Sequence, residues 1–159
     1  MSFYLWTKLL HLVAAIVMVG TSNANGVIRL YVNRHGEVWL VAAGSRLIMM
    51  LNRRLMVPSL LLLPATGVVL ALTARYPLLS GWILAGELGT VLLWVLFLGG
   101  VVLERKMELV SRDAFERGTI EIPEAYRSAD RWGLVVGLSA TIVELGVLFI
   151  MVFRSAASW

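Results

Sequence analysis

Three ionisable residues lie inside long apolar stretches of this chain: His11, Glu87 and Glu144. A charged side chain at the centre of a bilayer costs at least about 2.5 kcal/mol, so such residues usually face a cavity, a partner or a cofactor. An imidazole beside carboxylates can bind haem iron, hold a divalent transition metal or form a hydrogen-bonded network. We therefore expect any chemistry of this chain at these three positions.

The segments that position these residues are membrane spans. The chain has 159 residues, of which 59% are hydrophobic and 15% charged, and this leaves too little polar surface for a soluble domain. About 20 apolar residues cross a bilayer as a helix. The spans are expected at about 3–30, 55–73, 82–103 and 132–153, with connections at 31–54 and 104–131. This predicts an all-α fold, a bundle of four transmembrane helices that forms one domain over 1–159.

The sequence also indicates how the first and second spans begin. The helix of the second span is expected to begin earlier, near Val38, and to bend at Pro58 or Pro64, which lie inside the span. The first span begins like a signal peptide, with Lys8 followed by an apolar run and small residues. We expect it to be a retained membrane helix.

The basic residues are distributed unevenly over the connections. Five belong to the first connection and its flanks, six to the second, and only three (Lys8, Arg75 and Arg154) to the opposite side. The positive-inside rule therefore predicts a multi-pass membrane protein with both termini on the outer side. The net charge of +4 then suits anionic lipid, and no nucleic-acid partner is expected. The absence of cysteine excludes disulfides and thiolate metal sites.

Helical spacing places the polar residues of the first two spans on shared faces. The first stripe is Lys8, His11, Ala15, Met18, Ser22, Asn25 and Arg29, and the second is Asn52, Ser59, Thr66 and Thr73. Both stripes are expected to face the interior of the bundle. The fourth span carries a similar stripe, formed by Gly133, Gly137, Ala140 and Glu144. Small residues (Gly81, Ala85 and Gly89; Gly133 and Gly137) predict close helix packing, and with it a homodimer.

The three ionisable residues lie at similar expected depths. Counted from the outer ends of their spans, His11, Glu87 and Glu144 are about 12, 8 and 15 Å deep. Three interpretations stay open: a structural network, a haem site with His11 as axial ligand, and a metal site formed by all three residues. Met18 is one option for the second axial ligand, because the only other histidine, His35, lies in a polar connection. No hydrolase motif is present.

Several motifs resemble a known family. Trp6-x-Lys8-x-x-His11, Asn52-Arg53-Arg54-Leu55 and Tyr126-Arg127 are similar to HemJ-type protoporphyrinogen oxidases and, more loosely, to CopD-like membrane proteins. Across nearly its whole length, the chain most resembles a bacterial family of small four-span predicted integral membrane proteins of unknown function. This resemblance implies a bacterial inner (plasma) membrane, with both termini on the periplasmic side. The chain departs from the HemJ pattern at Met18 and Glu87, so the resemblance does not carry over porphyrinogen oxidation.

The HemJ resemblance implies haem b, bound by His11, in a redox or haem-handling protein. Arg53 and Arg54 would meet a propionate or anionic lipid, and Glu87 and Glu144 would support the site or carry protons. Two alternatives stay open. One is a non-enzymatic subunit or scaffold of a membrane complex. The other is a CopD-like metal carrier, whose thioether ligands would be Met18, Met49, Met50 and Met56. Whether the protein is an enzyme is left open.

Overall fold

The structure, a computed structural model, describes residues 2–153, and the regular secondary structure of this part is entirely helical. The elements are α1 (Ser2–His35), α2 (Val38–Leu51), the π-helical turn η1 (Asn52–Met56), α3 (Val57–Thr73), α4 (Gly81–Glu116) and α5 (Glu124–Phe153). Within the described part, four helical stretches are long and apolar enough to cross a membrane: α1, α2 to α3, α4 and α5. The all-α four-span fold is therefore confirmed. Arg154 lies outside the described residues.

The second span is one long helix interrupted by a single wide turn. The helix begins at Val38, as the sequence predicts, and runs to Thr73. At η1 the N–H of Val57 bonds to the carbonyl of Asn52, five residues earlier. Pro58 follows directly, and a proline ring collides with the carbonyl four residues before it. The wide turn therefore lies just before Pro58, while Pro64 is accommodated inside α3.

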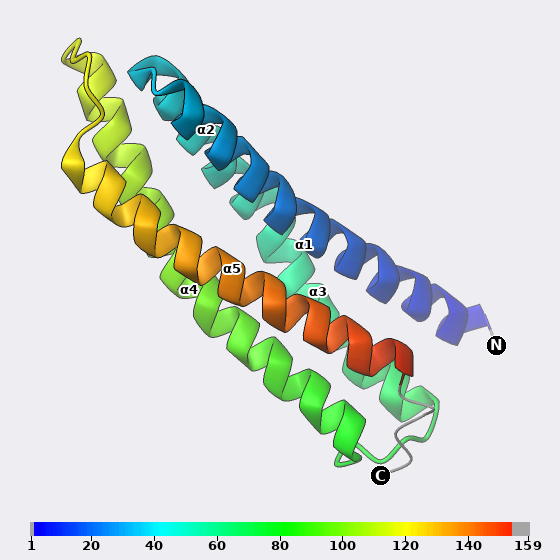
Figure 1. Cartoon of the computed structure of the whole chain (residues 1–159). Coiled ribbons are helices and arrows are strands. Elements are labelled where there is room, and N and C mark those ends of the chain that lie inside the picture. Colours follow the sequence, from blue (N-terminus) through cyan, green and yellow to red (C-terminus); the bar gives the residue numbers. More distant parts are fainter. Residues whose placement is uncertain (1, 154–159) are drawn as a thin grey trace.

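The helices pack unequally along the bundle (Figure 1). Helices α4 and α5 form a hairpin in contact along its length, α1 packs against α3, and α2 packs against α4. Contacts between α1 and α5, and between α3 and α4, are few. The molecule therefore consists of two well-packed pairs that are joined most firmly through α2.

Glycine allows the α4–α5 pair to approach closely. A Cβ at Gly86 would overlap with Met151, and one at Gly89 would overlap with Val147. The predicted close packing is thus present, and Gly89 of the expected set makes the contact together with Gly86, which was not in that set. These glycines are used within the chain, so they are not a free face for a second copy. The homodimer stays a prediction.

One end of the bundle carries a small apolar core around Tyr126. This side chain is 2% exposed and packs with Val32, Val41, Met107 and Ala129. Its hydroxyl donates to Asn33 Oδ1 at 2.9 Å. A membrane-interface position is the ordinary expectation for tyrosine. Here the ring instead holds α5 against α1 and α2.

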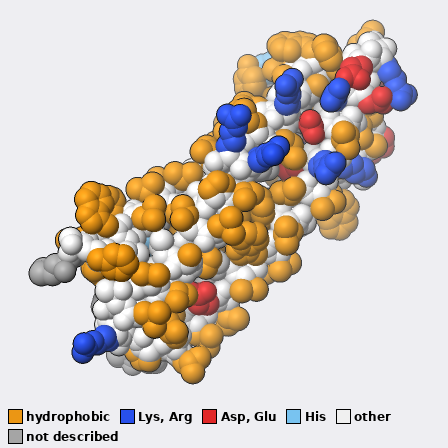
Figure 2. Space-filling view, turned by 180° about the vertical axis from the view of Figure 1, so that it is seen from behind, with side chains coloured by type: hydrophobic (Ala, Val, Ile, Leu, Met, Phe, Trp, Pro, Cys, Tyr) orange, Lys and Arg blue, Asp and Glu red, His pale blue; other side chains and the backbone are white. Residues whose placement is uncertain are grey.

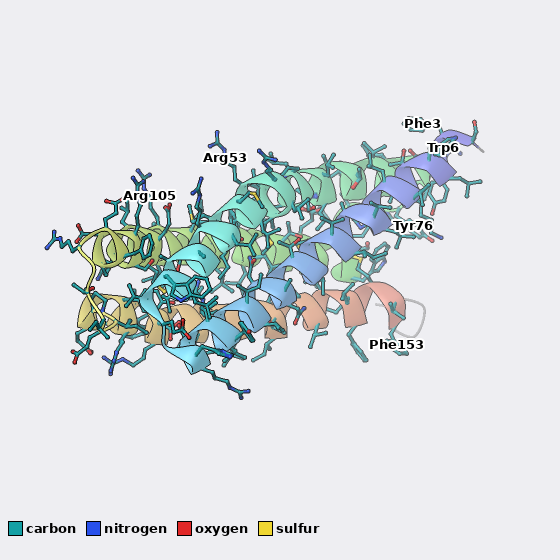
Figure 3. The ribbon with its side chains drawn as sticks, turned by 90° about the horizontal axis from the view of Figure 1, so that it is seen from above. Phe3, Trp6, Arg53, Tyr76, Arg105 and Phe153 are labelled. Atoms are coloured by element: carbon teal, nitrogen blue, oxygen red, sulfur yellow. The ribbon has the colours of Figure 1, made fainter. Side chains whose placement is uncertain are left out.

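The two ends of the molecule differ in chemistry. Lys and Arg side chains gather at one end, and hydrophobic side chains cover most of the remaining surface (Figure 2). Phe3, Trp6, Tyr76 and Phe153 lie at the other end, and Arg53 points away from the bundle (Figure 3). We call these the basic end and the aromatic end. Exposed apolar side chains along the helices between them imply contact with the bilayer.

Candidate functional site

His11 is fixed by a contact between α1 and α3. Its Nδ1 lies 2.8 Å from Thr66 Oγ1. The single hydroxyl proton of Thr66 is directed at the carbonyl of Leu62, so Nδ1–H donates and the hydroxyl oxygen accepts. The carbonyl of Leu63, which can only accept, also lies beside the ring. This tautomer leaves the lone pair on Nε2.

Glu87 comes close to the same ring. A Cβ placed on Gly67 would lie 3.5 Å from His11 Cε1 and 4.0 Å from Glu87 Oε1, so the imidazole and the carboxyl flank this glycine. Both side chains are half-buried, in the part of the bundle nearer the aromatic end. The structure thus brings together two of the three ionisable residues that the sequence singles out.

Glu144 lies apart from this pair, which corrects the expected convergence. Its carboxyl group lies beside the side chain of Ser22 on α1. Ser22 is eleven residues beyond His11, or about 16.5 Å along the helix. Counting residues from the outer ends of the spans gives the wrong depth for Glu144, because the helices differ in length and their ends are not level. Among residues 2–153 no three His, Asp or Glu side chains are placed to hold a metal ion, so the metal site of His11, Glu87 and Glu144 is not assembled.

The expected haem ligands do not gather around His11 either. Met18 is two helical turns away, about 10.5 Å along α1, and packs against Leu60 and Leu93. Arg53 and Arg54 are exposed at η1, about 20 Å from the level of Thr66. The residues present therefore fit one axial bond to a haem iron, through His11 Nε2, but not the complete ligand set.

A cavity of about 370 Å³ lies between the two helix pairs. Four helical segments contribute to its wall: Met18, Ser22, Asn25, Arg29 and Asn33 from α1; Asn52, Met56 and Leu60 from η1 and α3; Leu93, Phe97, Gly100 and Glu104 from α4; and Asp130, Gly133, Gly137, Ala140 and Glu144 from α5. His11 is not among the described residues that line it. The walls are largely apolar, and the polar groups are placed at a few points, as in ligand-binding cavities generally.

The cavity opens sideways between α1 and α5, where these helices touch little. Val27 and Leu30 on α1 and Leu134 and Leu138 on α5 line it and are also exposed on the apolar surface. Within the described chain, a Cβ at Gly26 or Gly137 would have nothing within 4 Å. The opening therefore faces the hydrocarbon of the bilayer.

An ionic cluster closes the cavity toward the basic end. Arg29, only 7% exposed, pairs with Glu104 of α4 and lies 3.4 Å from Asp130 of α5. A guanidinium presents several N–H donors in a fixed plane, so one side chain can join three helices. This cluster fixes the distance between α1 and the α4–α5 pair at that end.

Two oxygen atoms in the cavity wall are buried and have no hydrogen-bond partner among the described residues. They are Glu144 Oε2 and Asn25 Oδ1. The amide nitrogen of Asn25 donates to Asn52 Oδ1 at 2.8 Å, and the wide turn η1 begins at Asn52. Buried polar atoms are usually paired, so an unpaired acceptor in a cavity wall indicates that a bound molecule supplies the donor.

Sequence reasoning found part of this site. It placed Ser22, Asn25, Arg29 and Glu144 on inward stripes, and the structure confirms this placement. It missed the cluster around Arg29, because Glu104 and Asp130 belong to the polar connection at 104–131, and mixed charges in such a connection are typical of a solvated face. The signal was available. One further helical step extends the stripe of Gly133 and Glu144 to Asp130.

The chain belongs to a family of predicted integral membrane proteins (DUF2269), whose family model matches residues 5–155. This confirms the resemblance to a family of small integral membrane proteins. Comparison with curated proteins and with solved structures found no match. The HemJ-like and CopD-like features stay predictions.

Proposed function

We propose that this integral membrane protein takes a small amphiphilic molecule from the bilayer and binds it in the cavity between α1 and α5. The observation that carries this proposal is Glu144: a carboxyl group, 2% exposed, with one unpaired oxygen in a largely apolar cavity wall. An ionisable group inside a membrane protein costs free energy, so such a group usually has a function. The expected ligand has an apolar body and a head group that donates hydrogen bonds.

The lateral opening supports this proposal. Val27 and Leu138 flank it and are exposed to the hydrocarbon, so an apolar molecule can approach without crossing water. Toward the basic end the cavity is closed by the ion pairs of Arg29. The geometry therefore favours exchange with the lipid phase, and not passage of an ion across the membrane.

Blocking the cavity tests the proposal. Gly137→Leu is expected to fill the cavity without a clash, because a Cβ there meets no described atom within 4 Å. A nitroxide-labelled long-chain alcohol is added to the protein in phosphatidylcholine nanodiscs, and its immobilised fraction is measured by electron paramagnetic resonance. The wild-type protein should immobilise the probe, and the variant should lose most of this signal.

Gly99→Leu is the matched control. Gly99 is an exposed glycine on α4, also with open space around its Cβ position, and it is not among the described residues that line the cavity. This variant should immobilise the alcohol like the wild type. An equal signal from the wild-type protein and Gly137→Leu would contradict the proposal.

Haem b binding through His11 is the second candidate. It is favoured by the contact between His11 Nδ1 and Thr66, which fixes the tautomer and leaves Nε2 available. Haem would supply one-electron chemistry, while Thr66 would hold the imidazole in position and Glu87 would place a carboxyl group beside it. A redox or haem-handling role would follow only if haem is bound.

An absorption spectrum decides this candidate. If haem is bound, the protein purified in detergent should show a Soret band, and the band should be lost in His11→Ala. Thr66→Val should retain the band with a weaker affinity for haem, because the imidazole keeps Nε2 but loses its positioning contact. A colourless protein that acquires no such band when haem is added would exclude this role.

A further inference from the structure

The charges in the cavity wall are unbalanced. Four charged side chains line it: Arg29, Glu104, Asp130 and Glu144. Arg29 pairs with Glu104 and Asp130, which leaves Glu144 without a cation among the described residues. The fully ionised wall carries two negative charges in excess, whereas the whole chain is basic, with a net charge of +4. The cavity is therefore acidic in a protein that otherwise repels cations.

The surroundings of Glu144 define what would satisfy it. Glu144 lies beside the side chain of Ser22, and its Oε2 has no partner within residues 2–153. A buried carboxylate without a cation is strongly destabilised, and a cation that also donates hydrogen bonds relieves that cost. Ammonium groups with N–H bonds meet both needs, whereas a quaternary ammonium supplies only the charge.

A second acceptor lies close by on α1. Asn25 is three residues after Ser22, on the same stripe, and its Oδ1 is also buried and unpaired in the described structure. Residues three apart on a helix are neighbours. A head group beside Ser22 can therefore reach both oxygens, which calls for at least two N–H donors on one atom.

The rest of the cavity wall limits the size and shape of the apolar part of the ligand. Leu93, Phe97 and Val136 contribute apolar surface to the same cavity wall as the two unpaired oxygen atoms. The cavity volume of about 370 Å³ is near the lower end for ligand-binding cavities. A single apolar chain suits this space better than a bulky ring system.

We propose that the cavity binds a protonated primary amine on an apolar chain, with its ammonium group between Glu144 Oε2 and Asn25 Oδ1. This inference rests on the proposed function and names the class of its ligand. The same chemistry is offered by a free single-chain amine and by the ethanolamine head group of a phospholipid, whose acyl chains would extend through the opening between α1 and α5.

The test compares three probes of equal chain length: nitroxide-labelled dodecylamine, dodecanol and dodecanoate. Each is titrated into nanodiscs of phosphatidylcholine that contain the full-length protein, and the immobilised fraction gives its affinity. The wild-type protein should prefer the amine to the alcohol by about tenfold or more, and bind the carboxylate most weakly. Glu144→Gln, which keeps the shape of the side chain, should reduce the preference to nearly one.

Two further variants keep the result interpretable. Glu144→Asp retains the carboxylate and should retain the preference for the amine, so it decides the question even if the glutamine variant fails to fold. Glu121→Gln removes a carboxylate from the exposed loop before α5 and should leave the preference unchanged. Equal binding of amine and alcohol by the wild type, or a preference that survives in Glu144→Gln, would overturn the inference.

The failure of the inference and of the proposed function can be told apart. If the alcohol and the amine bind equally and Gly137→Leu abolishes both, the cavity takes amphiphiles but has no preference for amines. If Gly137→Leu changes neither, the proposed function itself fails. Adding phosphatidylethanolamine to the nanodiscs distinguishes the sources: displacement of dodecylamine assigns the lipid head group, and retention assigns the free amine.

Discussion

Arg29→Met is expected to destabilise the protein by about 3–5 kcal/mol, the largest effect of any single substitution considered. The guanidinium is nearly buried and pairs with Glu104 and Asp130 on two other helices. Methionine would leave both carboxyl groups at a partly buried site without a cation, and their mutual repulsion would separate α1 from α4 and α5. The free energy of unfolding in mixed micelles, measured by denaturant titration, reports this loss.

A compensated variant and a surface control accompany this measurement. Glu104→Gln and Asp130→Asn together remove the stranded charges, so adding them to Arg29→Met should restore a large part of the stability. Arg112→Met breaks an exposed ion pair with Glu116 and should leave the stability nearly unchanged, because water screens the pair. A loss at Arg29 as small as that at Arg112 would show that the cluster does not hold the helices together.

Gly89→Val is expected to be the second most damaging change. A Cβ at this position would overlap with Cγ2 of Val147, a short branched side chain that cannot move aside. Overpacking of a close contact typically costs about 1–3 kcal/mol, and valine adds two further methyl groups. The α4–α5 hairpin should separate locally, with a lower midpoint of thermal unfolding in detergent.

Gly99→Ala is the control for this prediction. The glycine is on the same helix, but the Cβ position has open space among the described residues. Alanine is the better helix former, so stability should be unchanged or slightly higher. If Gly89→Val unfolds at the wild-type temperature, the close approach of α4 and α5 is not required for the fold.

Much of the fold follows from patterns that depend on neighbouring residues along the chain. Apolar length predicts four spans, and the spacing of Asn52, Ser59 and Thr66 predicts an inward face, which the burial of all three confirms. Thr73, the fourth member of that stripe, is exposed, because the helix ends there. Periodicity identifies which residues face inward, but it does not show how far along the helix that face is covered by its neighbours.

The site was less predictable, because it depends on how the helices are offset. His11 and Glu144 have similar distances from the ends of their spans, yet the contacts with Thr66 and Ser22 place them at different levels. Small shifts and tilts between helices are determined by close contacts such as Gly89 with Val147, which no single stretch of sequence specifies. The cavity is formed jointly by residues of four helical segments, so no single segment of the sequence predicts it.

The turn η1 explains why there is a cavity at all. An α-helix advances by about 100° per residue, so a turn that contains extra residues rotates all that follows relative to all that precedes it. Before the turn, the helix lies against α4, and after it, the same helix lies against α1. The helix of the second span therefore changes its main neighbour about halfway along its length and leaves part of α4 uncovered. In this protein the five-residue turn η1 creates the space in which a small molecule can bind.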